Sequence, residues 1–258
     1  MGAELIAWAE ALPPALMIFA RVLGLFLTAP VVGGEYAPPQ VKALLALAVT
    51  MILVPVLHLP VGIAGLPLVI GLGTELLVGV IIGYFFALFL EAVRFGGDLI
   101  GRQAGFAAAE YFDPGAGQTT GPVGHIFHLA VVALFLGLNG HHHFLLALQR
   151  SFAVVPLGGG VALGGLGMAT AGGAQQVFII ALSFSFPVMT AIMALTVADG
   201  VIARTIPQIN LLMITFINKI LITMLMLYLG VPLAVTFLEL VIGVGQEFTV
   251  MVMRSLGG

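Results

Sequence analysis

The stretch A-G-F-A-A-A-E-Y-F-D-P-G-A-G-Q-T-T-G-P-V-G, residues Ala104–Gly124, interrupts a very apolar chain near its middle. A run this rich in glycine and proline cannot propagate a helix, because proline lacks an N–H and glycine lowers helix propensity. It carries only two charges, Glu110 and Asp113. It is therefore either a tight connection between two membrane helices or a loop at membrane depth, where irregular backbone must be shielded from lipid.

The composition around this stretch is that of an integral membrane protein. Of the 258 residues, 61% are hydrophobic and 7% are charged, and the mean hydropathy is +1.21. Soluble domains carry about 25% charged residues. The formal net charge of −3 argues against a nucleic-acid partner, which needs a basic surface. The absence of cysteine excludes disulfides, thiolate nucleophiles and sulfur-ligated metals.

Apolar runs predict an all-α membrane protein with about six hydrophobic spans. The run that begins at Leu66 is long enough for a helix of roughly 50 Å, which exceeds a hydrocarbon core of about 30 Å. That helix must tilt, break or project from the bilayer. The spans are predicted at Pro13–Val32, Val41–Leu59, Leu66–Leu99, His125–Leu138, Ala174–Ala198 and Leu211–Leu229.

Prolines and glycines set the expected breaks. Pro13 and Pro14 suit the start of the first helix, Pro55 predicts a kink in the second, and Pro187 is expected to interrupt the fifth. The glycine-rich run Pro156–Gly173 predicts a linker that divides the chain.

The charges at the N-terminus and in the connections between helices bear on how the chain is inserted. Residues Met1–Leu12 contain two glutamates and no Lys or Arg. Because a secretory signal peptide begins with positive charge, we expect the first apolar segment to be retained. The distribution of Lys and Arg over the connections favours an N-terminus that faces outward.

Three ionisable residues lie inside apolar segments. Arg21, Glu75 and Lys219 are costly in hydrocarbon, so each should face protein or water and not lipid. Gly79 and Gly83 form a G-x-x-x-G pair one turn beyond Glu75. Small residues at this spacing permit close contact with a neighbouring helix, either in this chain or in a partner.

The end of the third segment carries charges of alternating sign. Arg94, Asp98 and Arg102 are spaced four apart after Glu91, so they share one helical face. This face is either a solvated helix end or an interface with a partner.

Five histidines lie close together. They do not form an H-E-x-x-H pattern, and three consecutive histidines point in different directions on any regular element. An interfacial turn is therefore favoured over a metal site. The histidines are His125, His128, His141, His142 and His143.

Several stretches occur together in one order along the chain. They are A-R-V-L-G-L-F-L-T-A-P-V-V-G (Ala20–Gly33), E-L-L-V-G-V-I-I-G-Y (Glu75–Tyr84) with G-D-L-I-G-R-Q-A-G-F (Gly97–Phe106), F-D-P-G with G-P-V-G, L-N-G-H-H (Leu138–His142) with R-S-F-A-V-V-P-L-G (Arg150–Gly158), and I-P-Q-I-N with N-K-I-L (Ile206–Leu221). Together they resemble the family of type III secretion export-gate proteins that includes the flagellar protein FliR. Two positions depart from the usual pattern: His143 extends the N-G-H turn, and Asn218 stands where an apolar residue or proline is more usual.

This resemblance implies one subunit of a helical export gate, with no enzymatic activity and no cofactor. Such a gate is a protein-conducting channel that exports unfolded flagellar components across the bacterial inner membrane, in the flagellar basal body. The implied partners are FliP, FliQ, FlhB and FlhA. Family members are similar to a FliP-like unit fused to a FliQ-like hairpin, so residues 1–160 and 161–258 are expected to form these two parts.

The resemblance also assigns a role to the opening stretch. The loop after the third helix is the family's plug, which projects into the closed pore, and here it corresponds to about residues 105–123. Its small residues and prolines suit a compact, movable stopper. The residues expected to form it are Gly105, Phe106, Tyr111, Phe112, Asp113, Pro114, Gly115, Gly121, Pro122 and Val123.

Two other functional classes compete with this interpretation. A secondary, ion-coupled transporter would also have broken helices and intramembrane carboxylates, but no internal repeat is visible. An intramembrane hydrolase would need a nucleophile, and the sequence has no G-x-S-x-G elbow. A discriminating observation is whether the purified chain is stable alone or only with partner subunits.

Overall fold

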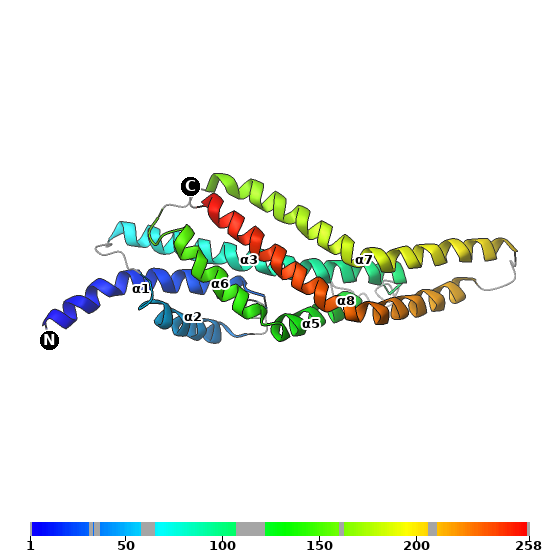
Figure 1. Ribbon diagram of the computed structural model, residues 1–258, viewed down its shortest axis with the longest axis horizontal. Coiled ribbons are helices and arrows are strands. Elements are labelled where there is room, and N and C mark those ends of the chain that lie inside the picture. The colour runs from blue at the N-terminus through cyan, green and yellow to red at the C-terminus, as the bar shows by residue number, and fades with distance from the viewer. Residues whose placement is uncertain are drawn as a thin grey trace. The chain divides into compact units, whose positions relative to one another are not determined.

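The fold is built from helices throughout the part of the chain that the structure describes. The computed structural model describes residues 2–30, 33, 37–57, 65–106, 122–159, 163–205 and 211–256, and no strand lies in these ranges. It does not describe the side chains of residues 2–11, 122–123, 163, 166, 211–212, 231 and 233. Figure 1 traces the elements in chain order. They are α1 (Gly2–Thr28), α2 (Pro39–Leu53), α3 (Leu66–Ala104), α5 (Pro122–Gly137), α6 (Gly140–Val154), the 3₁₀ turn η2 (Leu163–Gly165), α7 (Leu166–Thr205) and α8 (Leu211–Leu256).

Several of these helices are long and apolar enough to cross a membrane. Four stretches qualify, and a fifth does if α5 and α6 together form one span. Two shorter apolar helices, Leu12–Thr28 and Pro39–Leu53, accompany them. The predicted all-α, polytopic membrane class is therefore confirmed. The four stretches are Leu66–Ala104, Gly167–Thr205, Met213–Gly230 and Ala234–Leu256.

Proline breaks fewer helices than the sequence suggested. Pro13 and Pro14 lie inside α1, and Pro187 lies inside α7, so the predicted helix start and interruption were wrong. Likewise α8 continues through Pro232. A helix in an apolar setting tolerates proline, because neighbouring groups and local adjustments satisfy the freed backbone carbonyl. Pro55 does not kink a helix, since α2 already ends at Leu53.

The glycine-rich linker is also shorter than predicted. Helix α7 begins at Leu166 and includes Gly172 and Gly173. A Cβ added to Gly173 would lie 2.8 Å from the ring of Phe85, and one added to Gly172 would lie 3.4 Å from Phe248. Because these glycines have no side chain, α7 can pack closely against the two aromatic rings. This packing outweighs the low helix propensity of glycine.

By its contacts the chain divides into two compact units, each assembled from separate segments. Unit 1 consists of residues 1–88, 139–173 and 242–258, and unit 2 of residues 89–138 and 174–241. Each unit combines residues from before and after position 160, because the grouping follows spatial contacts and not chain order. The division into residues 1–160 and 161–258 stays a prediction.

The core of unit 1 is rich in phenylalanine. The rings of Phe26 and Phe86 both pack on Phe144 of α6, with centroids 6.1 and 5.8 Å apart. Phe85 packs on Phe248 of α8 at 5.2 Å. These ring contacts hold α1, α3, α6 and the end of α8 together around one apolar interior.

The core of unit 2 joins α3, α7 and α8. Ile100 and Ala104 of α3 are fully buried with Val188 and Ile192 of α7. The ring of Phe184 on α7 also packs against Phe127 of α5 and Phe237 of α8, with centroids 5.0 and 5.4 Å apart. Partly buried side chains that pack on the cluster are Phe106, Phe127, Phe184, Ile222, Met226 and Leu227.

Helix α3 ends in a complete glycine cap. The N–H of Gly105 donates to the carbonyl of Arg102 at 3.2 Å, and the N–H of Phe106 donates to Gly101 at 3.0 Å. Gly105 has φ of 96°, a left-handed conformation that glycine adopts readily. This pair of bonds is the Schellman motif. The helix is therefore terminated by its own backbone at the first residue of the predicted plug.

Candidate functional site

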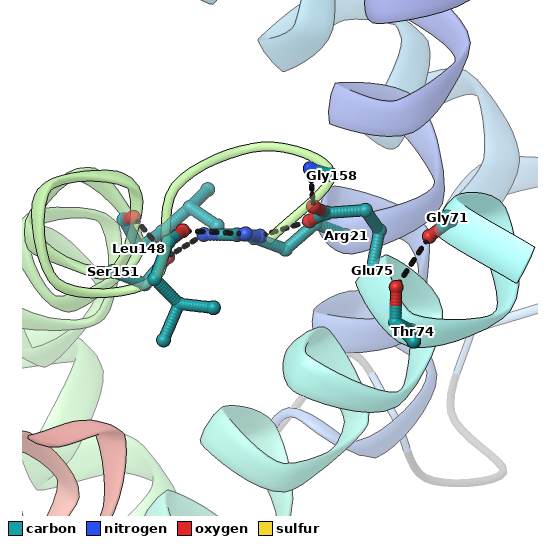
Figure 2. Close-up of polar contacts among 8 residues, drawn as sticks. Arg21, Gly71, Thr74, Glu75, Leu148, Ser151 and Gly158 are labelled. Atoms are coloured by element: carbon teal, nitrogen blue, oxygen red, sulfur yellow. Dashed lines mark hydrogen bonds and ion pairs between the residues drawn. The ribbon is translucent and has the colours of Figure 1, made fainter. Parts of the chain in front are cut away.

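The most polar feature in the interior of unit 1 surrounds Arg21. Its side chain, 0% exposed, extends from α1 between α3 and α6 (Figure 2). Nε donates to Oε2 of Glu75 at 2.5 Å, one terminal nitrogen donates to Oγ of Ser151 at 3.1 Å, and the other donates to the carbonyl of Val155 at 2.8 Å. One guanidinium group therefore connects three helices.

The partners of Arg21 are themselves held in place. The second carboxylate oxygen of Glu75 accepts the N–H of Gly158 at 3.1 Å. The hydroxyl of Ser151 donates to the carbonyl of Leu148 at 2.6 Å, which leaves its oxygen free to accept from Arg21. Glu75 is 2% exposed and Ser151 0%. The network thus pairs one buried cation with one buried anion, and both are hydrogen-bonded, as buried charges require.

The end of α6 suits a cation. Val155 is the C-cap of α6, and the last carbonyls of a helix have no partner within it. A positive charge there also interacts favourably with the helix dipole. The ring of Phe152 lies 4.3 Å from the guanidinium carbon, a cation–π distance. Arginine fits this position better than lysine, because its planar fork can serve several acceptors and stack on a ring at once.

The backbone of Arg21 takes part in a second contact, with the small residues of α3. A Cβ added to Gly79 would overlap the carbonyl oxygen of Arg21 and lie 2.8 Å from the N of Leu25. One added to Gly83 would lie 2.6 Å from the carbonyl oxygen of Leu25. From the other side, a Cβ on Gly24 of α1 would overlap the backbone of α3. Helices α1 and α3 therefore approach each other at glycine on both sides, the arrangement that small-residue spacing permits.

The profile of the bacterial export proteins, family 1, matches residues 12–243. The chain belongs to this export family. It is 31% identical to the flagellar biosynthetic protein FliR of Pectobacterium carotovorum subsp. carotovorum, over 86% of this chain and 85% of that one. It is 28% identical to the FliR of Escherichia coli strain K12, over 85% and 84% of the two chains. It is 26% identical to the FliR of Bacillus subtilis strain 168, over 83% and 85%. The resemblance read from the sequence is confirmed.

Sequence reasoning found only part of this export protein's network. Arg21 and Glu75 were singled out as charges at depth, but 54 residues separate them and no local pattern predicts their pairing. Ser151 and Gly158 were missed as partners, although both lie in the stretch R-S-F-A-V-V-P-L-G. The third charge, Lys219, lies half-buried on α8 in unit 2 and is not part of the network.

The charged end of α3 forms a second polar group, in unit 2. Nε of Arg94 makes an ion pair with a Glu91 oxygen, and Nδ1 of His128 on α5 lies 3.4 Å from the other. The carboxylate of Asp98 lies so close to Gly124 that a Cβ there would overlap it. This face of α3 therefore meets α5, the helix that follows the predicted plug.

The remaining histidines do not form a metal-binding group in the part of the export protein that the structure covers. His141, His142 and His143 lie in the first turn of α6 and not in a turn of their own. The break before them is at Asn139, which has φ of 56°. The predicted interfacial turn is therefore shorter than its sequence suggested.

The predicted plug lies mostly beyond the described ranges. Gly105 and Phe106 complete the cap of α3, and Pro122 and Val123 open α5. The other residues assigned to it, Tyr111, Phe112, Asp113, Pro114, Gly115 and Gly121, lie outside the described residues.

Proposed function

We propose that this export-family chain is a subunit of the flagellar type III protein export gate in the bacterial inner membrane. In this proposal it forms the protein-conducting channel together with FliP and FliQ, with FlhB and FlhA as further partners, and unfolded flagellar components pass through. The observation that carries the proposal is the family match over residues 12–243. The similarity to flagellar FliR proteins over most of both chains supports the flagellar setting.

The helices of the chain support an assembled gate. The 39 residues of α3 correspond to about 58 Å at 1.5 Å per residue, nearly twice the hydrocarbon thickness of about 30 Å. Helix α7 exposes a series of large apolar side chains, which suit lipid or the helices of sister subunits. They include Phe178, Leu182, Phe186, Met193, Val197 and Val201.

The network around Arg21 favours a gate subunit over a secondary transporter. A transporter places its intramembrane charges where substrate or coupling ions can reach them. Here the paired charges of Arg21 and Glu75 are 0% and 2% exposed, and protein groups occupy both carboxylate oxygens. An ion pair enclosed in this way fixes the arrangement of helices and offers no place for a solute.

Copurification tests the gate proposal. The full chain, tagged and expressed in a flagellated bacterium, is expected to be recovered with FliP and FliQ, as identified by mass spectrometry of the intact complex. A chain that is recovered alone, remains stable alone and moves a small solute in reconstituted vesicles would contradict the proposal and favour the transporter.

We also propose that residues 105–123 occlude the channel in the resting state. The stretch is nearly uncharged and carries Phe106, Tyr111 and Phe112, which can fill a narrow lumen. It starts at a capped helix end, with Gly105 at φ of 96°. Its far end joins α5, whose Gly124 packs against Asp98 of α3. Both ends are thus anchored to described helices of unit 2.

Deleting residues 107–121 should make cells that carry the assembled complex leaky to small ions and solutes and slow their growth. The reason is that the stopper is removed while both anchoring helices remain. Membrane conductance is the measurement, and copurification with FliP and FliQ is the control for assembly. A second variant replaces 107–121 by a Gly/Ser run of the same length. Wild-type conductance from the assembled deletion complex would refute the plug and leave an ordinary connection.

A cysteine at Phe112 provides an independent check, because the chain has no cysteine of its own. With a second cysteine at a pore-facing position of a partner subunit, a crosslink is expected in the resting state and should be lost during export.

A further inference from the structure

Asp199 of α7 is a buried acid with an unsatisfied carboxylate oxygen among the residues that the structure describes. Its side chain is 6% exposed, and its Oδ2 makes no hydrogen bond to the residues that the structure places. An ionised carboxylate in an apolar helix is costly unless a cation or a set of donors neutralises it. Asp199 takes part in none of the ion pairs or hydrogen bonds described above.

The alignment of α7 with α8 in their hairpin indicates which residue of α8 lies opposite Asp199. Helix α7 ends at Thr205 and α8 begins at Leu211, so counting six residues from each end places Asp199 opposite Ile217. The ring pair Phe184–Phe237, 5.4 Å apart, gives an independent alignment. Counting fifteen residues from each ring places Asp199 opposite residue 222. The only basic residue between these two limits is Lys219.

Lys219 also lies close to the buried side of α8. It is half-buried, and Thr223, one turn further on, is 0% exposed and donates its hydroxyl to the Lys219 carbonyl at 2.7 Å. Residues three and four apart share one helical face. Ile222 and Met226 of the same region pack on the cluster that contains Ile192 of α7. This side of α8 therefore faces the buried cluster of α3 and α7, and Asp199 is buried on α7 two turns beyond Ile192.

The other described cations of unit 2 are less suitable. Arg94 is paired with Glu91. Arg102 is exposed. It lies on the side of α3 opposite the buried residues Ile100 and Ala104. Arg204 is exposed and five residues from Asp199, whereas residues that share a helical face are three or four apart.

We propose that Asp199 is the counterion of Lys219, with the carboxylate accepting hydrogen bonds from the ε-ammonium group across the α7–α8 hairpin. In the structure no ion pair within 4.0 Å joins them, so the proposed contact requires another rotamer of the flexible lysine side chain. Such a pair neutralises two charges in apolar helices and fixes the register of the hairpin. It does not depend on the gate function.

Charge exchange tests the pair in the full chain, coexpressed with FliP and FliQ. Asp199→Lys and Lys219→Asp should each lower the recovery of folded, membrane-inserted chain by about tenfold or more, because each leaves two like charges facing each other. The double exchange should restore most of the loss. Glu239, an exposed carboxylate on α8, supplies the matched control: Glu239→Lys combined with Lys219→Asp should restore nothing.

A neutral pair covers the case in which reversed charges prevent folding. Asp199→Asn and Lys219→Met should each lower recovery, and the two together should lower it less than the product of the single effects. Rescue in either the exchanged or the neutral pair supports the inference. Where the single variants are recovered at reduced yield, rescue in neither pair overturns it.

If none of these variants is recovered, cysteines at 199 and 219 decide the question. They should form a crosslink within the chain, and a control cysteine at the exposed Val197 should not. A crosslink from position 199 to a partner subunit, or no crosslink at all, would show that the counterion lies elsewhere.

Discussion

Glu75→Leu is expected to destabilise the folded protein by about 3–5 kcal/mol, the usual effect of removing one partner from a buried ion pair. The change leaves the Arg21 guanidinium buried without its carboxylate and removes the acceptor of the Gly158 N–H. The thermal unfolding midpoint of the purified complex, together with its yield, measures the effect. Glu239→Leu, at an exposed carboxylate, is the control and should stay within about 0.5 kcal/mol.

The double variant Arg21→Met/Glu75→Leu separates two explanations of that loss. Apolar side chains of similar volume often replace a buried ion pair at little cost, and Ser151 keeps its hydrogen bond to Leu148. Most of the lost stability should therefore return. If the double variant is as unstable as Glu75→Leu, the network contributes through its geometry and not through charge balance. If Glu75→Leu matches the Glu239 control, the buried pair is not important for folding.

Replacing both Gly79 and Gly83 by leucine is expected to abolish the complex while the chain still inserts into the membrane. A single Cβ at Gly79 already overlaps the backbone of α1, so no side-chain rearrangement can accommodate leucine there. Helices α1 and α3 must then separate, and that separation also draws Arg21 away from Glu75. Complex recovery and membrane fractionation are the two measurements.

Gly73 supplies the control for this experiment, because it lies on α3 and a Cβ there meets nothing within 4 Å. Gly73→Leu should therefore assemble like the unmodified chain. Recovery of the Gly79/Gly83 double variant at the unmodified yield would show that the close approach of α1 and α3 is dispensable for assembly.

Composition and hydropathy were enough to predict an all-helical membrane protein, because apolar runs of this length have few other stable arrangements. Helix ends were less predictable. Pro187 reads as a break in a water-soluble helix, yet it lies within α7, because a helix surrounded by apolar groups gains little by unfolding its backbone. The same reasoning applies to Pro13 and Pro14 in α1.

The two charges of the candidate site, Arg21 and Glu75, were predictable from the sequence, but their pairing and their other partners were not. Inserting Arg21 into an apolar segment is costly, so its burial against protein could be expected. Its acceptors could not, because one lies on α3 and two at the end of α6, 130 or more residues away. Nothing in the sequence around Ser151 and Val155 indicates a cation nearby, and only the packing of three helices brings them to the guanidinium.

The cap at the end of α3 has a mechanical consequence. The carbonyls of Gly101 and Arg102 are satisfied by the N–H groups of Phe106 and Gly105, so the last turn of the helix does not rely on anything beyond Phe106. If the following segment acts as the proposed plug, a force that pulls on it meets a pivot at Gly105, and the helix behind that pivot does not have to unwind. The plug proposal therefore requires no rearrangement of α3 itself.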